Sequence, residues 1–152
     1  MRPLLFVIAL LIPGIALAAN NVALSSAVFL EKTIADNNGH SRIVLEEPKA
    51  VTPGDQLVFI LNYRNAGSAP AKDFIVTNPL PSAVAYQGSG DGAQVSIDGG
   101  RSWGTLPALK VREADGRWRN ARPEDVTHVR WALKQTVAAG AQGKLSFRGI
   151  VR

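Results

Sequence analysis

The sequence of 152 residues contains no cysteine, one methionine and two histidines. Without cysteine the chain cannot form a disulfide framework, a thiolate zinc site, a cysteine nucleophile or a lipid-modified cysteine. Charged residues make up 19% of the chain and hydrophobic residues 46%. This balance excludes intrinsic disorder, which combines low hydrophobicity with high net charge. The length and the apolar fraction suit one domain with its own core.

Residues that could perform catalysis are also scarce. The sequence has neither the G-x-S-x-G pattern of a serine nucleophile nor the H-E-x-x-H pair of a zinc protease. Asp36, Asp91 and Asp98 could each offer oxygens to Ca²⁺, but no spacing brings together the roughly six oxygens that such a site needs. An enzyme would require His40 or His128 to face a carboxylate in a cleft. We therefore expect a noncatalytic protein with no cofactor and no bound metal.

The first residues follow the pattern of a secretory signal peptide. Arg2 supplies a positive charge, and the run from Leu4 to Leu17 is almost wholly apolar. Small residues stand at Ala16 and Ala18, the two positions that a signal peptidase reads, so we expect cleavage after Ala18. An uncleaved membrane anchor is the alternative, but the run is shorter than the roughly 20 residues of a spanning helix, and Pro13 interrupts it.

The expected organisation is a signal peptide at residues 1–18 followed by one domain at residues 19–152. The mature chain is then extracytoplasmic, in the periplasm, on the outer surface or secreted, and it contacts a membrane only through the signal peptide before cleavage. Cytoplasmic nucleic acid is therefore not an expected partner. Because the exported chain has no cysteine, its stability must come from packing and from hydrogen bonds within sheets.

Most of the mature chain shows the alternation of half-buried strands rather than a helical period. The alternation is clearest near the C-terminus, where two sets of apolar residues each share one face: Val129, Trp131 and Leu133, then Leu145, Phe147 and Val151. The segment from Gln56 to Arg64 is apolar on both faces, which is typical of a central strand covered on each side. The strand that begins at Phe74 should end after Thr77, because Pro79 cannot donate to a sheet ladder.

Further short strands are expected at residues 22–34, 42–45, 84–87, 94–97 and 109–113. Turns rich in Gly, Asn and Asp separate them, and the side chains of Asn65 and Asn78 are expected to hold the backbone of the adjacent turns. Many short strands without helices between them predict an all-β fold, either a sandwich or a barrel.

Three motifs follow one another in the first half of the mature chain: Pro53-Gly54-Asp55 before a strand, Tyr63-Arg64-Asn65-Ala66-Gly67 at its end, and Asn78-Pro79-Leu80-Pro81. Together with Ser96 to Trp103, Arg130 to Leu133 and the final strand, these motifs resemble the DUF11-type repeat domain of bacterial cell-surface proteins. The resemblance extends from about Leu45 to Arg152. It implies an immunoglobulin-like antiparallel β-sandwich of about seven to nine strands. It also implies an exported, adhesin-like surface or envelope protein, and it brings no catalytic residues.

Ser96 to Trp103 also fits S-x-D-x-G-x-[ST]-W, the Asp-box pattern of sialidases and other propeller proteins. In that pattern the Asp and Ser side chains bond to the turn backbone, and the Trp packs beneath the hairpin. Propellers repeat the motif in several blades, and one copy in a chain of this length cannot close a propeller. We therefore interpret the segment as a stapled turn rather than as a glycan or calcium site.

Charge is unevenly distributed along the chain. Residues 101–152 hold 11 Lys and Arg against 4 Asp and Glu, whereas residues 19–100 hold 5 against 8. Several of the basic residues lie on the outward faces of the last two predicted strands, which could be neighbours in a sandwich. A stripe of this kind, with an exposed tryptophan beside it, would attract anionic polysaccharide. The residues concerned are Arg117, Trp118, Arg119, Arg130, Lys134, Lys144, Arg148 and Arg152.

Charged side chains on outer strand faces also discourage edge pairing, and we favour this interpretation of the basic residues. The sequence thus predicts a noncatalytic envelope or surface module that binds another envelope protein or itself. Edge-strand addition is one route, and we expect the C-terminal strand to form such an edge. The alternative is a carbohydrate- or polyanion-binding module that uses Trp118 and the basic strands. Binding of anions should weaken steeply with salt, whereas a protein contact should not.

Overall fold

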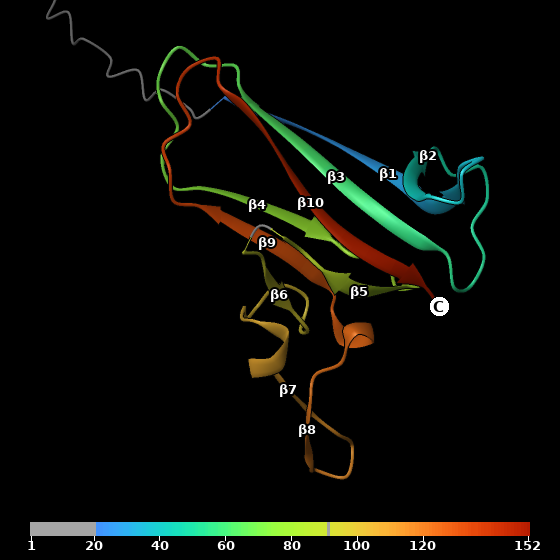
Figure 1. The fold of residues 1–152 in the computed structure, drawn as a ribbon. Helices are drawn as coiled ribbons and strands as arrows, with labels where there is room; N and C mark the ends of the chain where they lie inside the picture. Colours follow the sequence, from blue (N-terminus) through green and yellow to red (C-terminus); the bar gives the residue numbers. More distant parts are fainter. Residues whose placement is uncertain (1–20, 91) are drawn as a thin grey trace, which may run out of the picture.

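The structure is a computed structural model that describes residues 21–90 and 92–152. This part of the chain is all-β, with ten antiparallel strands and no α-helix (Figure 1). Two short 3₁₀ turns, η1 (Leu106–Ala108) and η2 (Pro123–Asp125), complete the secondary structure. None of the described residues forms a helix that is long and apolar enough to cross a membrane. The expected signal peptide at residues 1–18 lies outside the described residues.

The larger sheet has five strands in the order β2-β1-β3-β10-β5. Its members are β1 (Val22–Ala35), β2 (Ser41–Glu46), β3 (Gln56–Asn65), β5 (Val84–Gly88) and β10 (Gln142–Val151). β3 lies in the centre, as its apolar sequence predicts. The expectation that both faces of β3 are covered holds only in part. Leu57, Phe59 and Leu61 are buried on one face, whereas Val58 is the buried residue of the other face, on which Asn62 and Arg64 are exposed.

The smaller sheet has three strands in the order β4-β9-β6. Its members are β4 (Phe74–Pro79), β6 (Gln94–Ser96) and β9 (His128–Leu133). A separate two-stranded hairpin, β7 (Lys110–Arg112) and β8 (Trp118–Asn120), extends away from both sheets (Figure 1). The hairpin turns at Asp115 and Gly116, where the sequence predicts a turn.

The two sheets share one hydrophobic core, and Phe147 of β10 lies in its middle. The Phe147 ring stacks on Phe59 of β3 with the ring centroids 4.4 Å apart. Its centroid is 6.0 Å from that of Trp131 on β9 in the other sheet, and 6.4 Å from that of Tyr86 on β5. Val129, Trp131 and Phe147 are almost completely buried. The alternation that the sequence shows in β9 and β10 is therefore confirmed.

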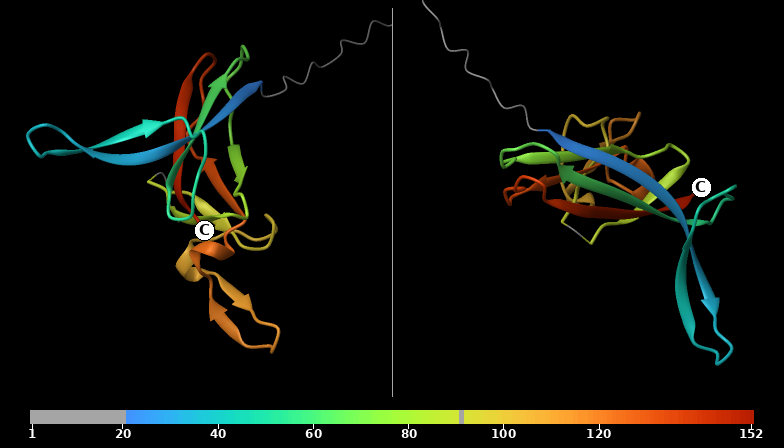
Figure 2. Two further views of the ribbon diagram at one scale, coloured as in Figure 1. Left: turned by 90° about the vertical axis from the view of Figure 1, so that its right-hand side faces the viewer. Right: turned by 90° about the horizontal axis from the view of Figure 1, so that it is seen from above.

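β1 is long enough to pair with two strands, β3 and β2. It pairs with β3 from Val22 to Glu31 and with β2 from Leu30 to Ala35. Beyond Glu31, β1 pairs only with β2, and the hairpin that these two strands form projects from the sheet (Figure 2). We call residues 32–46 the arm.

The largest differences from the predicted strands concern β4 and β8. β4 continues through Asn78 to Pro79, which pairs with His128, instead of ending after Thr77. Because β4 is the edge strand of its sheet, a missing N–H can face away from β9 without loss of a ladder hydrogen bond. β8 was not expected, since the three residues Trp118–Asn120 are too few to show an alternation.

The C-terminal strand is not a sheet edge, so this expectation was wrong. β10 pairs with β3 on one side and with β5 on the other. The sequence shows the alternation of a strand but not the number of its neighbours, because sheet order depends on contacts between distant segments. The free edges of the larger sheet belong instead to β5, to β2 and to the part of β1 that β2 does not reach.

The position of Phe147 predicts a large loss of stability when its ring is removed. Phe147→Ala should lower the free energy of unfolding by about 3 to 5 kcal/mol, because it opens a cavity between the two sheets. Ile75→Ala is the matched control on β4, where the side chain is 52% exposed. It should cost less than about 1 kcal/mol. Urea unfolding of both variants measures the difference, and equal losses would contradict this description of the core.

Candidate functional site

The turn from Ser96 to Trp103 is held by the carboxylate of Asp98. This carboxylate accepts hydrogen bonds from the backbone N–H groups of Arg101 and Ser102 at 3.0 and 2.9 Å. It also accepts them from the hydroxyls of Ser102 and Ser96 at 2.5 and 2.7 Å. The Ser96 hydroxyl in turn accepts the N–H of Gly100. The predicted bonding of the Asp and Ser side chains to the turn is confirmed.

Trp103 packs against this turn and anchors it to β9. Its indole N–H donates to the carbonyl of Gly100 at 3.0 Å. The guanidinium of Arg130 lies 4.3 Å from the centroid of the indole, and the His128 ring meets the indole edge-on. Arg130 also donates to the side-chain oxygen of Gln94. Arg130 therefore packs against the hairpin.

The hydrogen bonds to Asp98 stabilise its charged form. The Ser102 hydroxyl is the largest cause, followed by the Ser102 backbone N–H and the Ser96 hydroxyl, and together they hold the pKa of Asp98 well below its usual range. A carboxylate with such a low pKa is a poor proton donor or acceptor near neutral pH. The chemistry of the turn thus supports a staple and not a general acid or base.

The basic residues of the last two strands do not form one stripe. Arg130 and Lys134 belong to or follow β9 in the smaller sheet, whereas Lys144 and Arg148 lie on β10 in the larger sheet, with Arg152 just after it. The expectation that the two strands are neighbours was therefore wrong. Similar alternation in both strands could not reveal that they belong to opposite sheets.

Arg148 of β10 and Arg152, which follows the strand, are engaged within the chain. The Nε of Arg148 lies 3.0 Å from a carboxylate oxygen of Glu31 on β1. Arg152 donates to the carbonyl of Ser82. Lys134 and Lys144 are exposed and form no ion pair among residues 21–90 and 92–152, and the side chain of Arg148 is itself 55% exposed despite its ion pair.

Arg119 on β8 is also engaged. Its guanidinium donates to both carboxylate oxygens of Asp125 at 2.6 and 2.7 Å, and its Nε lies 3.3 Å from Glu113. Asp125 also accepts the backbone N–H of Arg122. Because Asp125 belongs to η2, its hydrogen bonds to Arg119 fasten the hairpin to η2. The hydrogen bond to Arg119 lowers the pKa of Asp125 and raises the pKa of Arg119. Arg119 therefore holds the β7–β8 hairpin in place.

Trp118 is the exposed aromatic of this hairpin. Its side chain is 65% exposed, and the guanidinium of Arg112 lies 6.0 Å from its ring centroid across the strand pair. Arg117 is paired with Asp115 at 2.6 Å but remains largely exposed. Of the predicted triplet, Trp118 and Arg117 therefore face solvent and Arg119 does not.

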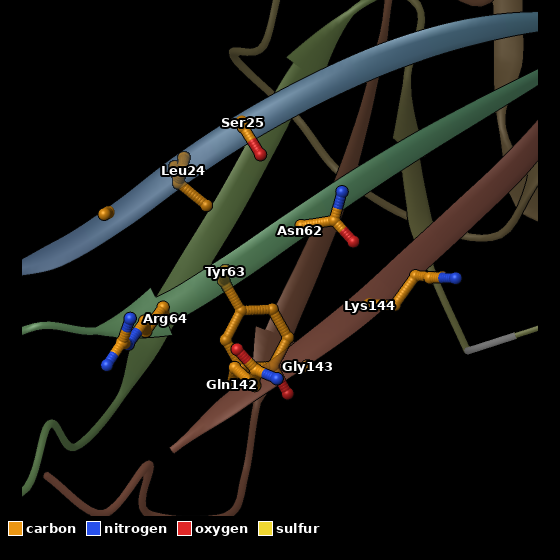
Figure 3. Close-up of a pocket in the computed structure, with 9 residues that line it drawn as sticks. Leu24, Ser25, Asn62, Tyr63, Arg64, Gln142, Gly143 and Lys144 are labelled. Carbon is orange, nitrogen blue, oxygen red and sulfur yellow. The ribbon is translucent and has the colours of Figure 1, made fainter. Parts of the chain in front are cut away.

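A shallow depression of about 530 Å³ lies across β1, β3 and β10 near the start of β1 (Figure 3). Two cross-strand rows contribute polar side chains to it, Ser25–Asn62–Lys144 and Ala23–Arg64–Gln142. Tyr63 lies against Gly143, where a Cβ would stand 2.2 Å from its hydroxyl. The lining contains two cations and no acid. Of these residues only Lys144 was a candidate from the sequence, because the rows exist only once three distant strands are paired.

Neither histidine lies in a catalytic arrangement. His40 is exposed at the turn of the arm, with its Nδ1 3.4 Å from Asp36. The Nδ1 of His128 lies 3.0 Å from the hydroxyl of Thr127, and its ring packs on Trp103. Within residues 21–90 and 92–152, no group of three or more His, Asp or Glu side chains could hold a metal ion. Asp91 lies outside the described residues.

Comparison with known proteins finds no matching family model, no matching curated protein and no matching solved structure. The resemblance to the DUF11-type domain therefore stays a prediction.

The Asp98 staple predicts a stability difference that depends on pH. Asp98→Asn should lower the free energy of unfolding at neutral pH, because the native carboxylate is stabilised by its hydrogen bonds. A lowered pKa in the folded state stabilises above the ordinary carboxyl pKa of 3.8, and this stabilisation is lost as the pH falls below that value. The gap between the variant and the wild type should therefore shrink in acid.

Urea unfolding over a pH series measures this gap. Asp115→Asn is the control, since Asp115 also sits in an exposed turn but accepts only one backbone N–H. Its effect should be small at every pH. A gap for Asp98→Asn that stays constant down to strongly acidic pH would contradict the role of its charge.

Proposed function

We propose that the protein is an exported, noncatalytic interaction module of the cell envelope or surface that binds another envelope protein or a second copy of itself. Its fold is of the immunoglobulin-like β-sandwich type. The shared core between a five-stranded and a three-stranded antiparallel sheet supports this fold type, as do the DUF11-like motifs. Residues 1–18 direct export, and the mature chain acts outside the cytoplasm.

The arm is the observation that carries this proposal. An isolated two-stranded hairpin is marginally stable in water, and one that projects from a domain gains little from the core. The arm nevertheless exposes Ile43 and Leu45, whose side chains are 60% and 44% exposed. Both lie on one face of β2, on the same side of the sheet as Phe29. Apolar side chains on a projecting element are typical of a surface that a partner covers.

A second candidate function is the binding of an anionic polysaccharide. The observation that favours it is the depression between β1 and β10, where Arg64 and Lys144 lie in adjacent cross-strand rows without an acidic neighbour in the lining. The β7–β8 hairpin offers another exposed surface, where the aromatic ring of Trp118 lies next in sequence to the cation of Arg117. Five of the eight candidate side chains make ion pairs or hydrogen bonds within the chain, which weakens this candidate relative to the first.

The arm predicts that two apolar substitutions abolish partner binding without unfolding the protein. The double variant Ile43→Ser, Leu45→Ser should lose a partner that the wild-type chain captures from an envelope extract of the source organism. Ile75→Ser is the matched control, because Ile75 is a similarly exposed isoleucine on β4 in the other sheet. Mass spectrometry of the captured material, at low and at high salt, measures the outcome.

Capture that survives high salt, persists in Ile75→Ser and is lost in the arm variant is the expected result. Equal capture by all three proteins would contradict a role for the arm. Recovery of polysaccharide that high salt removes, and that Arg64→Ala with Lys144→Ala prevents, would favour the second candidate.

A further inference from the structure

The first half of β1 has a partner on one side only. β3 pairs with it from Val22 onwards, but β2 reaches only as far as Leu30 on the opposite side. Among the described residues, the segment Val22–Phe29 therefore forms a sheet edge with no neighbouring strand. The backbone groups of such an edge are a template for another strand.

This edge lacks the features that normally prevent strand addition. Natural edges carry charges, proline or bulges. The sequence VALSSAVF of residues 22–29 contains no charged residue, no proline and no glycine, and its register with β3 runs without a bulge. The other edges differ, since β2 carries Arg42 and Glu46, β4 ends in Pro79, β5 has five residues, and β6, β7 and β8 have three residues each. Among the strands of the described part of the chain, the β1 edge is thus the unprotected one.

A groove of about 200 Å³ runs beside the same edge. It lies between the two sheets and is lined by Leu24, Ser25 and Ser26 of β1, by Leu61 of β3 and by Val76 to Asn78 of β4. Leu61 and Val76 belong to the core, while Leu24 is 53% exposed. A strand added to β1 would direct every second side chain toward this groove.

We propose that the strand added at this edge is β1 of a second copy of the chain, in an antiparallel pair centred on Ser26. This inference rests on the proposed function, because it names the partner of the same interaction module. A two-fold axis perpendicular to the sheet makes the contact isologous and closes it as a dimer. The five-stranded sheets of the two copies then become one continuous sheet.

The self-pairing matches the side chains of the edge. On the groove side, Leu24 lies opposite Val28 of the second copy, and Ser26 lies opposite its own equivalent. On the other side, Ala23 lies opposite Phe29 of the second copy, so that a small residue meets a large one. No charges are opposed, and cross-strand pairs of this kind stabilise a sheet. The pairing runs from Ala23 to Phe29 and stops where Leu30 is already paired with Glu46.

A chain without cysteine allows a direct test of this register. In Ser26→Cys the two new thiols should stand opposite each other, with Cβ atoms about 5 Å apart. Mild oxidation or a short thiol-to-thiol reagent should therefore give a covalent dimer in dilute solution. Ser41→Cys is the control, because Ser41 is exposed on the arm and far from the edge. A dimer yield for Ser26→Cys no higher than for Ser41→Cys would overturn the proposal.

Charge substitutions test the same contact without a covalent crosslink. Ser26→Lys and Ser26→Glu each place two like charges face to face, so each variant alone should be monomeric in sedimentation. An equal mixture of the two should recover the dimer, because opposite charges then meet. Circular dichroism confirms that both variants fold. Dimers of either variant alone, as stable as the wild-type dimer, would overturn the inference.

Sedimentation and partner capture, measured on the same protein, separate the failure of this inference from the failure of the proposed function. The protein is produced from its full-length sequence in a host that exports it, and its first residue is read by intact mass, with Ala19 expected. If the wild-type chain is monomeric while capture of an envelope protein still depends on the arm, the dimer fails and the proposed function stands. If Ser26→Lys abolishes capture of a foreign protein but the chain never dimerises, the edge serves a different partner and the inference is wrong.

Discussion

The contact between Phe147 and its aromatic neighbours is the constraint on which the rest of the structure depends. Phe147 stacks on Phe59 within the larger sheet and meets Trp131 from the smaller one, so it joins the two sheets and sets which faces of β3 and β10 point inward. A slip of one residue in either strand would turn every buried side chain to solvent. The register of β3 therefore also sets the register of β1, which pairs with it over ten residues.

β1 combines two environments within a single strand. Its first half belongs to the sheet that covers the core, while its second half leaves the sheet and joins β2 in the arm (Figure 2). This division leaves one side of residues 22–29 without a partner and exposes the apolar residues of β2. The two surfaces that we assign to binding thus have one structural cause, the length of β1 relative to its neighbours. The basic residues, by contrast, are mostly engaged in holding hairpins and strands in place, as Arg119 and Arg130 show.

Local features were predictable from the sequence, and long-range ones were not. The buried faces of β9 and β10 follow from alternation, and the Asp98 turn follows from side chains within eight residues of one another. Asn65 holds its turn as expected, because its side chain accepts the N–H of Gly67 and donates to the carbonyl of Ala69. The assignment of β9 and β10 to different sheets, the continuation of β4 to Pro79 and the polar rows of the depression depend on which strands become neighbours. No pattern within a single strand contains that information.

The most direct measurement of the central claim is amide hydrogen exchange over residues 22–29 as a function of protein concentration. If β1 pairs with β1 of a second copy, exchange in this segment should slow as concentration rises, while exchange at the tip of the arm stays unchanged. Exchange that is independent of concentration in residues 22–29, or that slows in another segment instead, would contradict the account.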